Sequence, residues 1–204
     1  MSSCSGGSKL PKDWPRDILY LLSPSYSNAL TDEAHKFIFL SKLNLPSNTE
    51  VRRVSGPHTN VKITPISDTF HPAHGQFGLF AGQHLSPDTL ILPYLGYVHG
   101  KADTDENSDY DLSLDRDHAL GVDASKMGNE ARFINDYRSI SANPNAEFRD
   151  ISIDIGKGLV EKRIGVFVLS AGKSGKRAKG IAKGEEILVS YGKGFWTERL
   201  KPKE

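Results

Sequence analysis

The sequence predicts a mainly β protein with a small helical appendage at its N-terminus. From about residue 51 onward, short alternating or apolar runs are separated by Gly, Pro, Asn and Asp, a pattern typical of many short strands. Before that point the strongest signal is a helix, and neither an internal repeat nor a long helix follows it. We therefore expect three segments: a leader with the helical appendage (1–50), the β domain (51–196) and a short tail (197–204).

The appendage begins with a Ser/Gly-rich leader, residues 1–12, which we expect to be disordered. The apolar segment 14–22 predicts one or two helical turns packed against a larger body. Thr31 can cap a second helix, because Asp32 and Glu33 suit its positive end. One face of that helix holds Ala34, Phe37, Ile38 and Ser41, and Pro46 ends it. We expect this helix to pack or dock without chemistry of its own.

Seven runs of the β domain predict strands, and they are 61–63, 77–80, 90–95, 110–114, 151–155, 164–169 and 187–189. A basic, glycine-punctuated loop, 172–180, lies between the last two runs. A solvated hairpin tip is the favoured interpretation of this loop. A contact with an acidic partner or a weak nuclear-import patch are the alternatives.

Charge and cysteine content exclude several classes of protein. With 26 Lys and Arg against 25 Asp and Glu, the net charge of +1 gives no overall field for nucleic acid or membranes. Loop 172–180 has no interleaved aromatic residues, so direct nucleic-acid binding is not expected. No apolar run has the length of a membrane span or of a signal peptide, and no membrane partner is expected.

The single cysteine, Cys4, can form neither an internal disulfide nor a cysteine-cluster zinc site. The spacing of the seven histidines suits no metal site either, so no metal is expected. These features predict a nuclear or cytoplasmic protein.

Three separated segments can carry chemistry. In the first, Gly75 and Gly78 flank Gln76-Phe77 ahead of an apolar strand, where glycine would let the backbone approach a ligand or simply form a turn or bulge. The second runs from 128 to 137 and is followed by Asn143-Pro144-Asn145. Its polar residues alternate with apolar ones, as in a partly buried site or a loop held by its own asparagines. The third runs from 183 to 192, where a strand ends in a tyrosine and a glycine.

Taken together and in this order, the three segments resemble the SET domain, the fold of most protein lysine methyltransferases. The resemblance covers about residues 70–196. Its most specific part is Val122 to Asn135, which follows the family's D-A-x-x-x-G-N-x-A-R-F-[IV]-N motif. The other matching parts are 76–81, 90–96, 110–114 and 183–192. The resemblance implies a β-clip fold of several small sheets around a pseudoknot, in which the last strand passes beneath the loop at 132–135.

The resemblance also implies an activity, methylation of a histone or other protein lysine with S-adenosylmethionine as the methyl donor. The residues that match the family's catalytic positions are Tyr191 and Tyr110. Those that match its cofactor positions are Gln76, Phe77, Gly78, Arg132, Phe133, Asn135 and Asp136. Phe195 and Trp196 would close the substrate channel where many relatives use a cysteine-rich zinc tail, which a chain with one cysteine cannot build.

Some positions depart from the family's pattern. Gln76 replaces the first glycine of the opening motif, and Asp136 replaces the histidine of the Asn-His pair. These departures support a second hypothesis, a catalytically silent SET domain that acts as a peptide- or cofactor-binding adaptor. Tyr191, Asn135 and Arg132 are retained and favour the enzyme.

Overall fold

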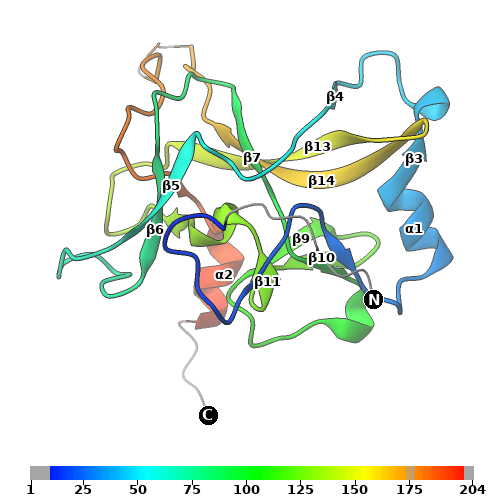
Figure 1. Cartoon of the computed structure of the whole chain (residues 1–204), viewed down its shortest axis with the longest axis horizontal. Coiled ribbons are helices and arrows are strands. Elements are labelled where there is room, and N and C mark those ends of the chain that lie inside the picture. Colours follow the sequence, from blue (N-terminus) through cyan, green and yellow to red (C-terminus); the bar gives the residue numbers. More distant parts are fainter. Residues whose placement is uncertain (1–9, 174, 176, 200–204) are drawn as a thin grey trace.

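The computed structural model describes residues 10–173, 175 and 177–199. The predicted leader up to residue 9, with Cys4, and the tail from residue 200 lie outside the described residues. So do Ser174 and Lys176 of the basic loop. Strands dominate the fold and form several small sheets, as the sequence predicts (Figure 1).

The longest feature is a hairpin of β13 (Ala146–Gly156) and β14 (Leu159–Val168), which crosses the upper part of Figure 1. Along its other edge, β14 pairs antiparallel with two strands, β3 (Phe39–Ser41) and β7 (Leu90–Tyr94). On the outer side of β13, β4 (Val51–Arg52) pairs in parallel. Strands that lie up to about 120 residues apart in sequence therefore share one five-stranded sheet.

A second sheet has four strands in the order β2 (Ser25–Tyr26), β8 (Tyr97–His99), β10 (Leu120–Asp123) and β9 (Asp111–Asp115). Three further pairs complete the β structure: β1 (Leu19–Tyr20) with β11 (Met127–Gly128), β5 (Val61–Pro65) with β6 (Phe77–Ala81), and β12 (Asn135–Asp136) with β15 (Leu188–Val189). The helices are α1 (Asp32–Ile38), α2 (Gly192–Arg199) and three 3₁₀ turns, η1 (Lys42–Asn44), η2 (Lys101–Asp103) and η3 (Glu130–Phe133).

All seven predicted strand runs overlap a strand of the structure. The reason is visible in β5, where buried Val61 and Ile63 alternate with exposed neighbours. In β14 nearly every residue is buried, because β3, β7 and β13 surround it. The division of domains at residue 50 stays a prediction, although β1 to β3 join sheets whose other strands lie beyond that residue.

The predicted N-cap of the first helix is confirmed. The hydroxyl of Thr31 accepts a hydrogen bond from the Ala34 amide at 3.2 Å, and Thr31 itself is extended. The predicted length is wrong, because α1 ends at Ile38 and the chain continues as β3. Pairing with β14 overrides the helical periodicity there, and Ser41 caps η1 instead of lying on the α1 face.

The predicted helical turns over 14–22 are also wrong. This segment contains only turns and β1, which pairs with β11. The Leu19 amide donates to the Lys126 carbonyl, and the Leu21 amide donates to the Gly128 carbonyl. The expected packing is present, since the Trp14 ring meets those of Tyr20 and Phe133 at centroid distances of 4.9 and 5.6 Å. Aromatic packing and strand pairing therefore decide the conformation.

The last strand, β15, passes beside a segment from the middle of the sequence, β12, and the predicted fold requires such a crossing. The segment before it lies beside β6, where the Ile187 amide donates to the Leu79 carbonyl. β15 then pairs in parallel with β12. Asn145 holds the crossing from the other side, because its side chain donates to the Glu186 carbonyl and accepts from the Leu188 amide.

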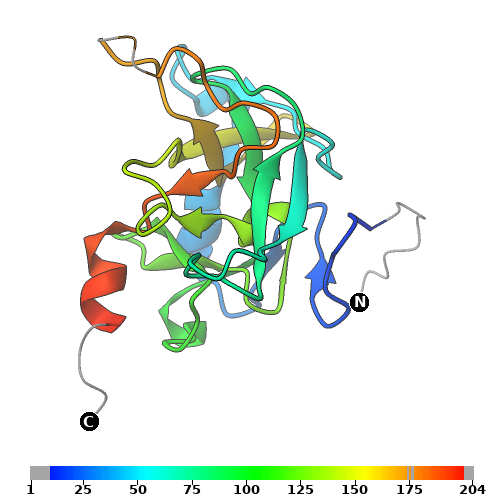
Figure 2. The ribbon, with the colours of Figure 1, turned by 90° about the vertical axis from the view of Figure 1, so that its left-hand side faces the viewer.

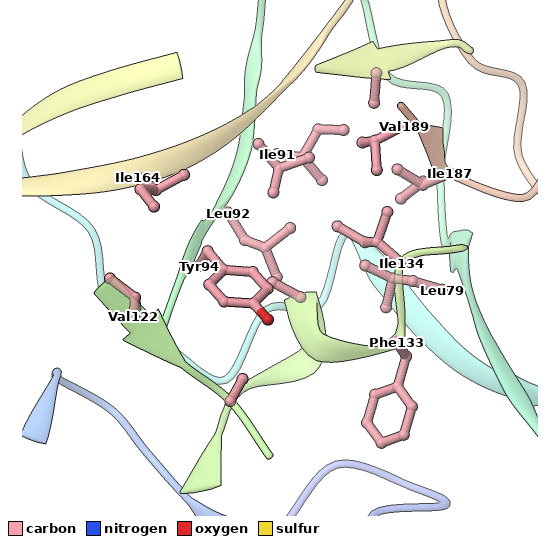
Figure 3. Packing of buried hydrophobic residues seen from close by; sticks show 14 of the residues in the cluster. Leu79, Ile91, Leu92, Tyr94, Val122, Phe133, Ile134, Ile164, Ile187 and Val189 are labelled. Atoms are coloured by element: carbon pink, nitrogen blue, oxygen red, sulfur yellow. The ribbon is translucent and has the colours of Figure 1, made fainter. Parts of the chain in front are cut away.

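The apolar core lies around this crossing (Figure 3). Leu79 of β6, Ile134, Ile187 and Val189 gather beside Ile91 and Leu92 of β7. Leu79, Leu92, Ile187 and Val189 are fully buried, and burial of each such side chain contributes about 1.5–3 kcal/mol. Phe133 points away from this group, toward the N-terminal segment. Residues on either side of the crossing are thus held by a dense core.

Candidate functional site

Two cavities share a part of their lining, which we call the shared wall. The first, which we call the acidic cavity, has a volume of about 680 Å³ and is lined by 104–106, 108–113, Tyr94, Phe148 and the shared wall, among others. The second, the aromatic cavity, has a volume of about 520 Å³ and is lined by 71–73, 75–77, Phe133, 135–136, Trp196 and the same wall, among others. The residues that line both are Asp109, Tyr110, Arg132, Tyr191 and Phe195.

Tyr191 is held at both ends within this wall. Its hydroxyl donates to the Ile134 carbonyl at 2.6 Å, and its amide donates to the Asp136 carboxylate at 2.7 Å. Burial and, after it, the nearby Asp136 charge raise the pKa of Tyr191 well above its ordinary value. The hydroxyl is therefore neutral at physiological pH, where it can accept or donate a hydrogen bond but cannot act as a phenolate base.

The other predicted catalytic residue, Tyr110, also lines both cavities. Its carbonyl accepts the Tyr94 hydroxyl at 2.6 Å, while its amide donates to Ser108. The Arg132 guanidinium carbon lies 4.5 Å from the centre of the Tyr110 ring. The same Arg132 donates to the Ala124 carbonyl, so its head group is fixed to the protein at the wall.

The opening motif has two different glycines. Gly75 has φ +79°, a backbone conformation that favours glycine, and lines the aromatic cavity with Gln76 and Phe77. Gly78 is absent from that lining. A Cβ atom on Gly78 would lie 2.6 Å from Glu186 Oε1, so this glycine makes room for a carboxylate of the same chain.

Asn135 connects three segments through that carboxylate. Its amide donates to Glu186 Oε1 at 2.8 Å and lies 3.4 Å from the Phe77 carbonyl. The other Glu186 oxygen lies 3.1 Å from His71 Nε2. Asn135 lines the aromatic cavity, and its neighbour Asp136 is buried beneath the C-terminal helix α2.

The predicted channel residues lie on α2, at the edge of the molecule in Figure 2. The Phe195 ring meets those of Tyr191 and Trp196 edge to face, at 4.9 and 5.3 Å between centroids. Phe133 lies deeper and contacts Phe77 at 5.9 Å. Every predicted site residue except Gly78 therefore lines the aromatic cavity, and the wall residues reach the acidic cavity as well.

Sequence reasoning missed Tyr94 and Glu186 as site residues. Tyr94 lines the acidic cavity, and its pKa is raised strongly by burial. Its place at the end of β7, in a Tyr-x-Gly run, was the available signal. Glu186 also stands in a matching segment, 183–192, but its role depends on Asn135 and His71, which are 51 and 115 residues away in sequence.

Within the part of the chain that the structure describes, no group of three or more His, Cys, Asp or Glu side chains is arranged to hold a metal ion. Across the same residues, no helix has the length and apolar character needed to cross a membrane.

Comparison with known proteins decides the family, because the sequence profile of the SET domain matches residues 76–192, more than half of the chain. The chain belongs to the SET-domain family. The matched range begins at Gln76 of the opening motif and ends immediately after Tyr191. It thus contains all the predicted catalytic and cofactor residues.

Individual relatives agree with this assignment. The histone-lysine N-methyltransferase set-2 of Caenorhabditis elegans is 31% identical over 128 residues, which are 58% of this chain and 7% of that protein. A crystal structure of the Chaetomium thermophilum polycomb repressive complex 2 superposes with a TM-score of 0.50 at 21% identity. It covers 72% of this chain and 17% of that chain, so the likeness concerns the fold.

A humanized mutant of the same C. thermophilum complex, bound to the inhibitor GSK126, has a TM-score of 0.49 and 19% identity over 67% of this chain and 15% of that one. The chain thus spans only a small part of the length of the proteins it matches.

Proposed function

We propose that this SET domain transfers a methyl group from S-adenosylmethionine to a lysine side chain of a protein substrate, such as a histone. The observation that carries the proposal is the single wall of Tyr110, Tyr191 and Arg132 between two cavities. Because both cavities reach these residues, a methyl donor in one cavity and a lysine in the other would meet at them. A histone substrate would place the protein in the nucleus.

The aromatic cavity fits the methyl donor. Its volume of about 520 Å³ lies within the range of roughly 300–1,000 Å³ that is usual for small-molecule sites. Aromatic rings of Phe77, Phe133 and Trp196 surround polar groups of Asn135 and Gln76, and π faces stabilise a positively charged ligand. S-adenosylmethionine, when bound, supplies an activated methyl group on a positively charged sulfur.

The acidic cavity fits a lysine-bearing peptide. Its lining includes the four acids Asp105, Glu106, Asp109 and Asp111, and Arg132 is the one basic residue among the lining residues that the structure describes. The exposed carboxylates of Asp105, Glu106 and Asp109 attract a basic peptide and favour its encounter by electrostatic steering. At the wall, tyrosine rings replace water around the amine.

The protein's own residues must make the amine reactive. Free lysine has a pKa of about 10.4 and is protonated at neutral pH, when its nitrogen cannot attack carbon. Aromatic surroundings penalise the ammonium form and favour the neutral amine. Tyr191 stays protonated, so we assign its hydroxyl to orienting the amine, and the proton of the ammonium leaves to water before the lysine enters.

Calorimetry with S-adenosylhomocysteine, followed by a radiolabelled methyl-transfer assay on core histones and whole-cell lysate, tests the proposal. Binding should raise the thermal midpoint, because it stabilises the folded state by about 2.7 kcal/mol at a hundredfold excess over Kd. Label in protein, lost when the acceptor lysine is changed to arginine, supports the enzyme. Cofactor binding without transfer to any acceptor would favour the adaptor, and no binding at millimolar cofactor would contradict both.

A further inference from the structure

The Asp136 carboxylate lies where three segments of the chain meet. Its side chain is almost fully buried, with 4% of its surface exposed. Oδ2 accepts from the Tyr191 amide at 2.7 Å, from Trp196 Nε1 at 3.2 Å and from Arg138 at 2.9 Å. Oδ1 accepts from the Arg138 amide at 2.9 Å.

Oδ2 thus accepts three hydrogen bonds and Oδ1 one, whereas a carboxylate has about four lone-pair sites, two on each oxygen. Asp136 therefore lines the aromatic cavity with oxygens that are already bonded to the protein. Oδ2 is fully occupied by these protein donors, and Oδ1 keeps one acceptor site beside the Arg138 amide. Most of the acceptor capacity of Asp136 is therefore used within the protein, which favours a structural role over the direct cofactor binding suggested by its sequence position.

Two of the donors, Tyr191 and Trp196, come from the C-terminal part of the described chain. Tyr191 stands at the end of the final crossing, and Trp196 lies five residues later on α2. Both are more than 50 residues from Asp136 in sequence, so its carboxylate joins α2 to the wall. Phe195, whose ring contacts that of Tyr191, is carried on the same helix.

We infer that Asp136 is a positioning residue, which orients Tyr191 and anchors α2 over the aromatic cavity; this inference rests on the proposed methyl transfer. Tyr191 is then fixed at its amide by Asp136 and at its hydroxyl by Ile134. The Asp136 carboxylate thus has the task of holding Tyr191 and α2 in position, and the ion pair with Arg138 holds the carboxylate itself in place.

An ionised carboxylate suits this task better than an amide. Asparagine offers one acceptor oxygen and an NH₂ group. In place of Oδ2, the NH₂ group would confront the three donors of Tyr191, Trp196 and the Arg138 guanidinium; in place of Oδ1, it would confront the Arg138 amide. In the second orientation the other three donors keep only a neutral oxygen, which is a weaker acceptor than a carboxylate. The Asp136→Asn variant therefore keeps the size of the side chain and weakens or breaks the bonds to Tyr191 and Trp196, which makes it the appropriate test.

The experiment compares Asp136→Asn with the matched control Arg138→Gln, which removes the ion pair and leaves the carboxylate free to bond to Tyr191 and Trp196. kcat, KM for the protein substrate and Kd for S-adenosylhomocysteine are measured for each. We expect Asp136→Asn to lower kcat on the order of ten- to a hundredfold, because small misplacements of reacting groups have effects of that size. Its Kd for S-adenosylhomocysteine should change less than kcat, and Arg138→Gln should lower kcat less.

A weaker Kd with unchanged kcat would overturn the inference and make Asp136 a cofactor contact. Equal losses of kcat in Asp136→Asn and Arg138→Gln would also overturn it, since the ion pair alone would then matter. If Asp136→Asn does not fold, Trp196→Phe replaces it. Trp196→Phe removes one donor and keeps an aromatic ring. We again expect kcat to change more than the Kd for S-adenosylhomocysteine, but by a smaller factor than in Asp136→Asn.

A spectroscopic measurement separates this inference from the proposed function. The indole N–H signal of Trp196 in a ¹H–¹⁵N spectrum, assigned with Trp196→Phe, reports the bond to Asp136 whether or not the protein transfers methyl groups. Asp136→Asn should shift that signal and leave the indole signal of Trp14, which bonds to Ile18, in place. An unchanged Trp196 signal refutes the inference, whereas a shifted signal in a protein without transferase activity refutes only the proposed function.

Discussion

The acidic and aromatic cavities share a wall but are built in different ways. The aromatic cavity is enclosed by segments far apart in sequence, whose polar groups bond to one another: Asp136 to Tyr191 and Trp196, and Asn135 to Glu186. The acidic cavity is formed largely by one continuous stretch, 104–113, which carries four carboxylates. The first arrangement fixes geometry and the second provides charge. We expect changes in the aromatic cavity to alter kcat or cofactor affinity, and changes in the acidic cavity to alter substrate recognition.

The largest effect should come from the shared wall itself. Tyr191→Phe removes the hydroxyl bonded to Ile134 and keeps the ring that packs against Phe195. Loss of one positioned polar group at a transition state typically costs about 2.7–4 kcal/mol, so methyl transfer should fall on the order of a hundredfold or more, or the number of methyl groups added should change.

Steady-state assays and mass spectrometry of the product measure both effects. Asn135→Ala is the comparison variant and should weaken S-adenosylhomocysteine binding first, because Asn135 links Glu186 and Phe77 at the cavity. An active Tyr191→Phe protein with unaltered rate and product would exclude the assigned role. Unfolding of Tyr191→Phe in a thermal melt would make Tyr191 a core residue instead.

The next effect is the dependence of the rate on pH. If the lysine must lose its proton before it enters, the neutral fraction, and with it kcat/KM, should rise about tenfold per pH unit below the lysine pKa of about 10.4. The pKa of Tyr191 is raised by burial, so its hydroxyl stays protonated and adds no falling limb over this range. Rates between pH 6.5 and 9 measure the slope, and Tyr191→Phe should keep that slope at a lower rate. A plateau near pH 7 would indicate a protein base within the site.

The buried side chain of Asn129 supports the acidic cavity, and its loss should lower the stability of the protein. Asn129 is 1% exposed, and its side chain donates to the Pro93 carbonyl and accepts from the Leu95 amide on either side of Tyr94. Asn129→Ala leaves buried groups unpaired and should lower the free energy of unfolding by about 1–3 kcal/mol. Because Tyr94 lines only the acidic cavity, KM for the protein substrate should rise more than Kd for the cofactor.

Denaturant unfolding measures this loss, and Asn48→Ala, the same change at an exposed position, is the control. If Asn129→Ala weakens only cofactor binding, Tyr94 does not belong functionally to the acidic cavity.

A smaller effect should follow from removing charge at the acidic cavity. The double variant Asp105→Asn, Glu106→Gln should raise KM for a lysine- and arginine-rich peptide a few-fold, since exposed ion pairs contribute about 0.2–1 kcal/mol each. The difference from the unmodified protein should shrink at high salt, because exposed charges are screened. Glu33→Gln on α1, which lies outside the lining of either cavity, is the charge control. An equal rise in KM for a neutral peptide would contradict the electrostatic explanation.

The same contrast explains what the sequence could predict. Local signals were sufficient for the strands, whose alternation reflects burial on one side, and for the Thr31 cap, whose partner is three residues away. The helix α2 carried no such signal, because glycine stands at Gly192 and Gly194 and its anchor, the Trp196 bond to Asp136, spans 60 residues. The predicted site residues other than Gly78 lie around one cavity, and their roles stay a prediction. The partners of Gly78 and Asp136 depend on non-local packing that one sequence does not display.

The smallest effect that we expect on stability comes from the charged partner of a carboxylate. In the aromatic cavity Asp136 pairs with Arg138, which does not titrate, whereas in the acidic cavity Asp111 Oδ1 lies 3.1 Å from the Nε2 atom of buried His99. The Asp111 carboxylate raises the pKa of His99 above its ordinary value near 6.5. A raised pKa means that the folded state binds the proton more tightly than the unfolded state. The stabilisation is therefore complete below the unfolded pKa and disappears as pH rises through the folded one.

We accordingly expect His99→Gln to destabilise the protein more at pH 5.5 than at pH 9, by at most about 1 kcal/mol between the two. Denaturant unfolding of both proteins at the two pH values measures the difference, and His84→Gln, at an exposed histidine, should not reproduce it. A larger loss at pH 9 would reverse the sign and show that His99 is held neutral. A loss that is equal at both pH values would assign His99 to packing, since Gly121 places its backbone against the His99 and Asp111 side chains and a Cβ there would lie 2.6 Å from each. Only the predicted sign would show that the charge of the pair formed by His99 and Asp111, of which Asp111 lines the acidic cavity, follows pH.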